Sequence, residues 1–237
     1  MKILVIGSGG REHALAWKAA QDETVSEVFV CPGNAGTELE EKLTNIAIDH
    51  TDFDSIEKFC HEQKIYLVII GPEQPLVNGL TDFLVSKNIN VFGPSKAAAQ
   101  LEGSKTFSKD FFKKYGIPTA DYASFDNFNS ASHHLNEINY PTVVKADGLA
   151  AGKGVIICEN KAEAIDALES IFNDNVFGSA GSRVVIEDFL KGEEASFIVL
   201  CDGESVIPLA SSQDHKQRDD GDHGPNTGGM GAYSPTP

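Results

Sequence analysis

VVKADGLAAGKGV, the stretch Val143–Val155, decides how the rest of the chain is interpreted. Its pattern predicts a short strand that delivers Lys145, then a loop of small residues, then the opening of a second strand. Gly148, Gly152 and Gly154 would let the backbone approach a ligand without Cβ clashes. Free N–H groups and an ammonium favour an anion, so phosphate is the ligand that suits this loop best. A glycine-rich hairpin turn without a ligand is the alternative for the loop alone.

Length and composition restrict the class of protein. The chain has 237 residues, of which 41% are hydrophobic, enough for two compact domains or one large one. No apolar run approaches the roughly 20 residues that cross a bilayer, so we expect no membrane partner. The formal net charge of −16 disfavours nucleic-acid binding, which needs a positive surface, although it does not exclude a small anionic substrate.

The cysteines and the N-terminus indicate the compartment. Four cysteines are scattered without a Cys-x-x-Cys pair, and Cys158 and Cys201 end apolar runs, which predicts buried thiols. The apolar run at Met1–Gly7 is short and enters glycine-rich sequence directly, unlike a cleavable signal. We therefore expect a reduced, cytoplasmic setting.

The N-terminal residues predict an anion site. An apolar strand is followed by GSGGREH at residues 7–13 and by a strong helix former at 14–20. The first-turn N–H groups of such a helix are unpaired and its dipole is positive there. The dinucleotide fingerprint would need a third glycine where Glu12 stands, which argues against a nicotinamide-dependent oxidoreductase. A tight strand-to-helix turn without a ligand is the structural alternative.

Strands and helices then alternate over roughly the first 95 residues. We expect strands at Val25–Cys31 and Tyr66–Ile70, a helix begun by Asp52 and a helix at Leu76–Lys87. This alternation predicts an α/β fold with a doubly wound parallel sheet. Ligands bind such sheets beyond the strand carboxyl ends, where the loops at 7–13, 32–37 and 71–73 are expected.

The second half has a different pattern. Ser95–Tyr115 is predicted to be helical with a break near Gly103, where we place a domain boundary. Lys105 then lies just inside a helix capped by Ser104, an unusual place for a cation unless it meets a phosphate, although a solvated lysine is the commoner case. From residue 121 the pattern is one of short strands and two helices, at Phe128–Ile138 and after Asn160.

The last part of the chain is polar and glycine-rich. Val206–Ala210 reads as a buried strand that runs into the polar residues 211–216, for which a solvated loop is the alternative. The predicted boundaries give an α/β domain at 1–103, a helical connector at 104–120, a segment of short strands and helices at 121–192 and a last segment at 193–237.

These segments resemble the ATP-grasp ligases, and within them the glycinamide ribonucleotide synthetase family. The resemblance spans the segments at 7–13, 32–37, 71–73, 101–105, 145–154, 213–216 and 224–231. The glycine loop alone would indicate only the superfamily, whereas the last two motifs together with the first are specific. The resemblance implies a pre-ATP-grasp domain on the doubly wound sheet, then an α+β ATP-grasp lid, then the start of a truncated ATP-grasp core.

The resemblance also implies a reaction. ATP, glycine and 5-phosphoribosylamine would give ADP, phosphate and glycinamide ribonucleotide through a glycyl phosphate, an early step of de novo purine synthesis. Such chemistry depends on positioning, charge neutralisation and exclusion of water, with ATP and Mg²⁺ or Mn²⁺ as cofactors. The full-length protein would be a monomer or weak dimer. Consistently, no Ser-His-Asp or Cys-His nucleophile pattern is evident in the sequence.

Site residues follow by resemblance. The two lysines 105 and 145 would bind the ATP phosphates, the loop 147–154 would cover them, the segment 187–190 would grip adenine, and Glu194 would hold the ribose. The residues of this ATP site are Lys105, Lys145, Gly152, Lys153, Gly154, Glu187, Asp188, Phe189, Leu190 and Glu194. The catalytic residues would be Asp214, Lys216 and Asn226. The other substrates would be bound by Gly9, Gly10, Arg11, Glu12, Asn34, Gly71, Pro72, Glu73, His215, Thr227 and Gly228.

Two departures from the family pattern matter. Gln217 stands where an arginine is often found, with Arg218 next to it as a possible substitute. The family also continues for roughly as many residues again, including the strands whose glutamate and asparagine bind the metal, so we expect no metal ligand within these 237 residues. We therefore expect a fragment that is inactive alone and exposes apolar surface.

Two further interpretations stay open. The chain could belong to another ATP-grasp carboxylate–amine ligase, such as a purine-pathway carboxylase-type enzyme, because the glycine loop is shared across the superfamily. It could also be a nucleotide-binding module without catalysis. An ADP-release assay with different candidate substrates would distinguish this synthetase from another ATP-grasp ligase. Activity regained on adding the C-terminal half would exclude a module without catalysis.

Overall fold

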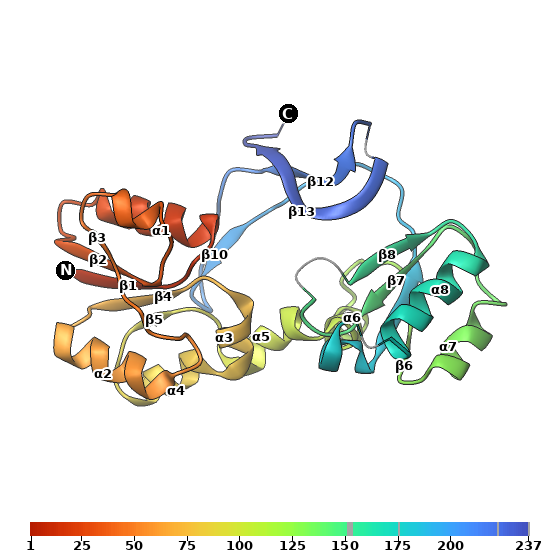
Figure 1. The fold of residues 1–237 in the computed structure, drawn as a ribbon, viewed down its shortest axis with the longest axis horizontal. Coiled ribbons are helices and arrows are strands. Elements are labelled where there is room, and N and C mark those ends of the chain that lie inside the picture. The colour runs from red at the N-terminus through yellow and green to blue at the C-terminus, as the bar shows by residue number, and fades with distance from the viewer. Residues whose placement is uncertain (151–153, 175, 222, 237) are drawn as a thin grey trace. The chain divides into compact units, whose positions relative to one another are not determined.

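The computed structural model describes residues 1–150, 154–174, 176–221 and 223–236. Their contacts divide the chain into two compact units, Met1–Gly103 and Ser104–Pro237. Figure 1 traces the elements of each unit by colour and label.

The first unit is built on a five-stranded parallel sheet in the order β3-β2-β1-β4-β5. Its strands are β1 (Lys2–Gly7), β2 (Glu27–Pro32), β3 (Leu43–Asn45), β4 (Leu67–Ile70) and β5 (Val91–Phe92). The predicted doubly wound parallel sheet is confirmed. The sequence analysis missed β3, because a three-residue strand is too short to show a periodic pattern.

Helices cover both faces of this sheet, with α1 on one side and α2 and α4 on the other (Figure 1). The helical elements are α1 (Gly10–Ala20), η1 (Thr37–Leu39), α2 (Phe53–Gln63), α3 (Glu73–Asn78), α4 (Leu80–Ser86) and α5 (Lys96–Gly103). Asp52 caps α2 as predicted, since its carboxylate accepts from Ser55 N at 3.1 Å. The single helix predicted at Leu76–Lys87 was wrong, because Gly79 adopts a left-handed φ of 97° between α3 and α4.

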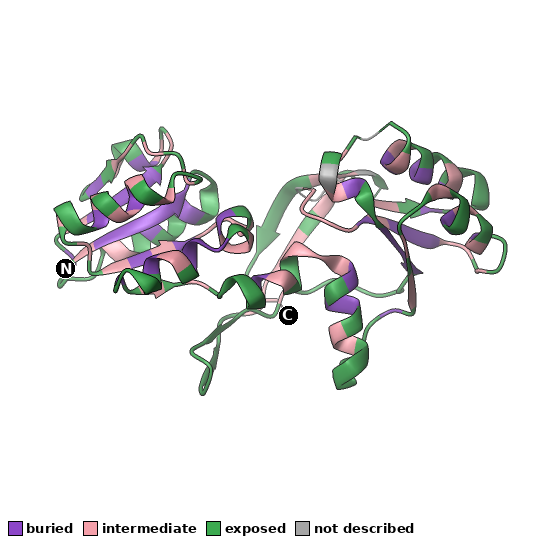
Figure 2. Cartoon of the chain, turned by 90° about the horizontal axis from the view of Figure 1, so that it is seen from below, coloured by how far each residue is buried: buried purple, intermediate pink, exposed green. Residues whose placement is uncertain are grey.

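The two faces of β1 belong to two different cores. Leu4 and Ile6 pack with residues of α2 and α4, whereas Val5 packs with Ala16 of α1 on the other face. Residues 3–6 are all buried, which is why the strand reads as a continuous apolar run rather than an alternating one. The buried strands of this sheet are purple in Figure 2.

The second unit begins with α6 (Lys105–Tyr115) and a four-stranded antiparallel sheet in the order β6-β9-β7-β8. The strands are β6 (Tyr122–Phe125), β7 (Thr142–Ala146), β8 (Val155–Cys158) and β9 (Val184–Asp188), and the helical elements beside them are α7 (Phe128–His134), α8 (Lys161–Phe172) and η2 (Gly178–Ser182). Residues of α7 and α8 pack on this sheet in one core. Asn160 caps α8 as predicted, accepting from Glu163 N at 3.1 Å, and α7 is shorter than predicted.

Two pairs of antiparallel strands follow. β10 (Val199–Cys201) pairs with β11 (Val206–Pro208), and β12 (Gln213–Asp219) pairs with β13 (His223–Tyr233). The strand predicted from Val206 is present as β11, but its predicted burial was wrong, because every residue of β10 and β11 is exposed. The alternative of a solvated loop at 213–216 was also wrong, since these residues lie in β12. We refer to residues 197–209 as the apolar ribbon.

The structure shows which of the predicted buried thiols are buried and how long its helices are. Cys31, Cys60 and Cys158 are buried free thiols, whereas Cys201 in β10 is exposed, so the predicted burial of Cys201 was wrong. Burial raises the pKa of the Cys31 and Cys158 thiols to about 11 and that of Cys60 to about 12. Within the described residues, no helix is long and apolar enough to span a bilayer.

We predict that a single thiol of the native chain reacts rapidly with a disulfide reagent at neutral pH. Cys201 is exposed, whereas the other three thiols are buried and held protonated. Absorbance of the released thiolate should show one fast equivalent, which Cys201→Ser removes and Cys158→Ser leaves unchanged. Fast reaction of two or more thiols in the folded chain would contradict the burial of Cys31, Cys60 and Cys158.

We also predict that the apolar ribbon makes the 237-residue chain self-associate. Phe197, just before β10, is 75% exposed, and Ile207 of β11 is 60% exposed. Phe197→Ser/Ile207→Ser should lower the concentration-dependent weight-average mass in sedimentation velocity without lowering the melting temperature. Leu39→Ser, at a singly exposed leucine that is 87% exposed in the first unit, is the matched control and should change neither. A chain that stays monomeric at all concentrations would show this expectation to be wrong.

Candidate functional site

Three loops of the first unit meet at the carboxyl ends of β1, β2 and β4. Gly33 N donates to Gly7 O at 3.1 Å, and the side-chain amide of Asn34 donates to Ser8 O at 2.9 Å. Arg11 Nη1 donates to Gly71 O at 3.1 Å. These hydrogen bonds join the loops at 7–13, 32–37 and 71–73 at one edge of the sheet, where ligands of doubly wound folds bind.

Glu12 fills the centre of this edge. It is 5% exposed, and its carboxylate accepts from Gly9 N at 2.8 Å. A Cβ added at Gly7 or Gly71 would collide with the Glu12 side chain, and Gly7 also has a φ of 132°, so both positions require glycine. The Glu12 side chain thus fills the space that a dinucleotide phosphate would occupy. It also accepts the hydrogen bond from Gly9 N that such a phosphate would accept.

Arg11 and Glu73 lie at the mouth of the same edge. Arg11 Nη1 is 2.9 Å from Glu73 Oε1, and both side chains are partly exposed. The hydrogen bond to Glu73 raises the pKa of Arg11. Partial burial alone would raise the pKa of Glu73, but the hydrogen bonds from Arg11 and from the Glu73 main chain, together with the Arg11 charge, outweigh it and lower that pKa. A guanidinium has five N–H donors, so Arg11 can also bind an anionic substrate beside exposed Gly10 and the Pro72 turn.

In the second unit, Asp147 binds the N-terminus of α6 to the root of the glycine loop. Its carboxylate accepts from Ser104 Oγ at 3.0 Å and from Thr106 N at 2.6 Å. Lys105 Nζ reaches back to Gly148 O at 3.0 Å. Asp147 was not among the predicted site residues, although its place directly after the strand that carries Lys145 was a signal.

Lys145 lies on β7 and forms an ion pair with Glu187 on β9. The Glu187 side chain is 7% exposed, and its second oxygen pairs with Lys109 of α6. Lys109 was also missed by the sequence analysis. Its signal was its position one helical turn after Lys105, which places both lysines on one side of α6.

The stem of the glycine loop is held by main-chain hydrogen bonds. Ala146 N donates to Gly154 O at 2.8 Å, and Gly148 N donates to Ala180 O at 3.1 Å. The predicted site residues Gly152 and Lys153 lie outside the described residues. The strand–loop–strand arrangement predicted from the sequence is confirmed, because β7 and β8 pair in an antiparallel hairpin.

The segment predicted to grip adenine leaves the sheet at the end of β9. Asp188 is its last strand residue, and Phe189 and Leu190 follow, 36% and 69% exposed. Their main-chain groups beyond the strand could bind an adenine edge. That role stays a prediction.

A second polar group gathers around Lys216 of β12. Its ammonium pairs with Glu194 and lies 3.7 Å from Asp214 Oδ2. Partial burial lowers the pKa of Lys216, but the bond to Glu194 and the two carboxylate charges outweigh it, so the pKa is raised. Thr227 Oγ1 donates to Lys216 O at 2.9 Å.

Other predicted residues lie along the same hairpin. Asn226 pairs with Gln217 in register, and the ring of His215 is 5.8 Å from that of Tyr233. Thr227 and Gly228 lie within β13, where Gly228 is exposed. Arg218, the possible substitute for the missing arginine, binds Asp219 through two nitrogens at 2.8 and 3.0 Å.

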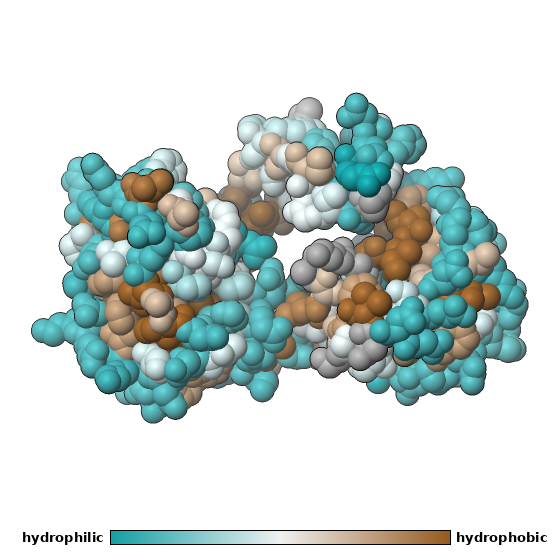
Figure 3. All heavy atoms as spheres, viewed as in Figure 1, coloured by the Kyte–Doolittle hydropathy of each residue, from teal (hydrophilic) through white to brown (hydrophobic). Residues whose placement is uncertain are grey.

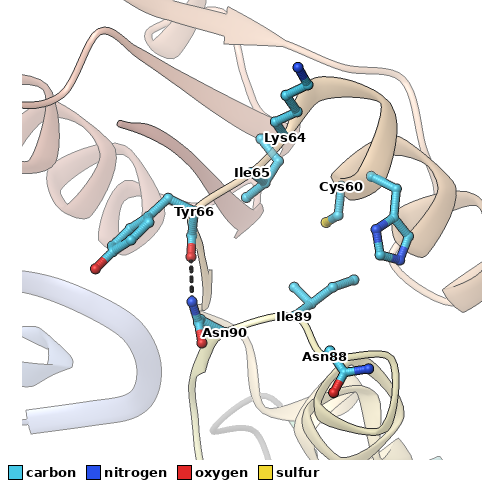
Figure 4. Close-up of a pocket in the computed structure, with 8 residues that line it drawn as sticks. Cys60, Lys64, Ile65, Tyr66, Asn88, Ile89 and Asn90 are labelled. Atoms are coloured by element: carbon cyan, nitrogen blue, oxygen red, sulfur yellow. Dashed lines mark hydrogen bonds between the residues drawn. The ribbon is translucent and has the colours of Figure 1, made fainter.

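A surface hollow of about 340 Å³ lies on the first unit at the opposite edge of the sheet from the three loops (Figure 4). Its lining includes Tyr66, just before β4, and Asn90, just before β5. The Asn90 amide donates to Tyr66 O at 3.1 Å. No predicted site residue lines this hollow.

The donors of the second unit fit a nucleotide better than a metal. Lys105 and Lys145 flank the root of the glycine loop, as an anionic phosphate chain requires. Among the described residues, no group of three or more His, Cys, Asp or Glu side chains is arranged to hold a metal ion.

Hydrophilic side chains cover most of the face in Figure 3, consistent with the acidic composition.

Two family models match the chain. Residues 1–102 match the N domain of phosphoribosylglycinamide synthetase, and residues 103–237 match its ATP-grasp (A) domain.

Individual relatives agree with these matches. The chain is 58% identical over 237 residues to the phosphoribosylamine–glycine ligase of Pseudomonas syringae pv. tomato, covering all of this chain and 55% of the relative. The crystal structure of the Thermotoga maritima phosphoribosylamine–glycine ligase matches with a TM-score of 0.81 and 36% identity, covering 100% of this chain and 56% of that chain. The chain thus spans about half the length of the curated relatives it matches.

A more distant structure shares the fold alone. The biotin carboxylase domain of the Hydrogenobacter thermophilus 2-oxoglutarate carboxylase, in complex with MgADP, matches with a TM-score of 0.72 and 22% identity, over 92% of this chain and 51% of that chain. With both units matched along their whole length, the chain belongs to the phosphoribosylglycinamide synthetase family.

Proposed function

We propose that this chain supplies the substrate-binding domain and the nucleotide-binding lid of an ATP-dependent ligase that joins glycine to 5-phosphoribosylamine. The products are glycinamide ribonucleotide, ADP and phosphate. The whole-length identity to phosphoribosylamine–glycine ligases supports this substrate pair over that of other ATP-grasp ligases. The reaction is assigned to the cytoplasm and to a full-length monomer or weak dimer, without a nucleic-acid or membrane partner.

The observation that carries the proposal is the meeting of two lysines at the root of the glycine loop. Lys105 Nζ bonds Gly148 O at 3.0 Å, and Lys145 lies two residues before Asp147, whose carboxylate caps α6. The ammonium groups are held by internal oxygens until phosphate oxygens replace these acceptors. A triphosphate supplies such oxygens and carries the negative charge that two lysines neutralise.

The chain's own residues would act by binding and positioning. A glycine carboxylate is a poor electrophile, so it must first take the γ-phosphoryl group, after which the ribosylamine nitrogen displaces phosphate. Lys105 and Lys145 neutralise the phosphate oxygens, and the glycine loop excludes water. Asp214 and Lys216 on β12, with Asn226 opposite on β13, are assigned to the reaction centre.

The metal is assigned more coarsely. ATP-grasp ligases use ATP with a divalent metal, and we propose Mg²⁺ or Mn²⁺ here, bound by residues that the matched part of the family does not include. No step is assigned to the metal, because no group of the described residues is arranged to hold one.

The three bonded loops of the first unit are proposed to bind the phosphoribosyl group. Arg11 supplies the cation, and Glu73 and Asn34 supply acceptors and donors for sugar hydroxyls. Glu12, with Gly9, Gly10, Gly71 and Pro72, shapes the turn beneath. His215, Thr227 and Gly228 of the second unit are proposed to bind the other substrates.

The proposal predicts activity once the chain is joined to the remainder of a relative. A chimera of residues 1–237 with the rest of the Pseudomonas syringae ligase should release ADP only when both glycine and phosphoribosylamine are present. Lys145→Met should lower that rate about 100-fold or more, because a charged contact to the phosphates is lost. Lys161→Met, a surface lysine that binds Asn136, is the control and should not change it. ADP release with another amine or acid instead would support a different ATP-grasp ligase.

We predict separately that Arg11 binds the phosphate of the sugar. Arg11→Ala should weaken binding of ribose 5-phosphate to the 237-residue chain about tenfold, the size expected for a charge-assisted hydrogen bond. Shifts of amide resonances in a titration followed by NMR measure this affinity. Lys18→Ala, in the last turn of the same helix, is the matched control. Equal affinities for Arg11→Ala and the wild type would remove the first unit from phosphate binding.

A further inference from the structure

Glu187 has one more lysine beside it than its charge needs. Lys109 of α6 pairs with one carboxylate oxygen and Lys145 of β7 pairs with the other. One carboxylate balances one ammonium, so the pair of lysines leaves one positive charge over. The two lysines are not equivalent, and their surroundings show which of them is the permanent partner.

The protein holds the Lys109 ammonium on several sides. It donates to Thr119 Oγ1 at 2.7 Å and to Ala120 O at 3.2 Å, and it forms the ion pair with Glu187. The Lys109 side chain is 11% exposed, against 26% for Lys145. Lys109 is therefore fixed, and Lys145 is the more accessible of the two.

We propose that Lys109 is a positioning residue for nucleotide binding: it keeps the Glu187 carboxylate paired and in place when Lys145 leaves to bind phosphate. This inference rests on the proposed function, in which Lys145 contacts the nucleotide. A buried carboxylate that lost its last cation would have to take up a proton when Lys145 leaves. With Lys109 present, Lys145 can move to the phosphate without that proton uptake.

Among the described residues, the two cations paired with the Glu187 carboxylate are Lys109 of α6 and Lys145 of β7. On β6, Tyr122 is opposite Glu187 in register, and its ring lies 5.7 Å from Lys109 Nζ. The Tyr122 hydroxyl donates to Asp110 at 2.5 Å and not to the Glu187 carboxylate. From β7, Thr142 donates to the Glu187 main chain at 2.9 Å, which holds the strand rather than the carboxylate.

The test compares ADP binding by the full chain and by Lys109→Met across pH. Without Lys109, nucleotide binding must be accompanied by proton uptake on Glu187, so the dissociation constant of the variant should rise with pH. ADP itself also titrates, and this affects both proteins equally. We therefore compare the ratio of the dissociation constant of the variant to that of the wild type. Measured from about pH 6 to about pH 8, this ratio should rise with pH, by at most about tenfold per pH unit, which is the limit for uptake of one proton. Amide shifts in NMR titrations measure weak as well as strong binding.

Two further variants make the readout specific. Lys113→Met removes an exposed lysine one turn along the same helix and should give a ratio near one at every pH. In a Glu187→Gln background, Lys109→Met should leave ADP affinity unchanged, because Lys109 acts through the carboxylate. This second pair also decides the question if Lys109→Met alone does not fold.

Several outcomes would overturn the inference. A ratio that does not change with pH would mean that Lys109 only packs the interior. A weaker affinity of Lys109→Met in the Glu187→Gln background would mean that it acts on the nucleotide by another route. If the wild-type chain binds no ADP, the proposed function fails together with this inference. If the wild type binds and only the pH dependence is missing, the inference alone fails.

Discussion

A buried carboxylate needs a cation beside it, and the second unit is arranged around that need at Glu187. The residue lies on β9, an inner strand of the sheet β6-β9-β7-β8, so its counter-ions come from neighbouring elements. One arrives from α6 and one from β7. The same interaction therefore joins the helix to the sheet and fixes the position of Lys145 in this structure. Removing one member of this charge balance is costly in a low-dielectric interior.

A related constraint acts in the first unit. Glu12 places a carboxylate inside a glycine turn that would otherwise resemble a dinucleotide site, and its bond to Gly9 N satisfies a donor at the start of α1. In both units an acidic side chain of the protein takes donors at a helix N-terminus: Glu12 at α1 and Asp147 at α6. Positive charge for a ligand is then left to arginine and lysine side chains that can turn outward.

The sequence predicted the parts of the fold that have a strong local signal. Asp52 and Asn160 cap their helices, and the apolar run of β1 marks a strand covered on both faces, because these features depend on neighbours in the chain. Gly79 was missed as a helix break, since an isolated glycine is tolerated within helices. The exposure of Cys201 could not be predicted, because an apolar run does not show whether another layer covers it. Of the three residues joined by the Glu187 ion pairs, the sequence singled out Lys145 and Glu187 but not Lys109, because its pairing depends on contacts between α6 and β9.

The spacing of the lysines on α6 has a consequence for how this helix can vary. Lys105 and Lys109 are four residues apart and follow the Ser104 cap by fixed steps along one rigid helix. Each inserted residue would turn the downstream lysine by about 100° around the helix axis. An insertion or deletion between them would therefore point one ammonium away from the sheet while the other stayed in place. The spacing between Lys105 and Lys109 on α6 must therefore stay at four residues. Insertions or deletions among the exposed residues after Lys113 would leave that spacing unchanged.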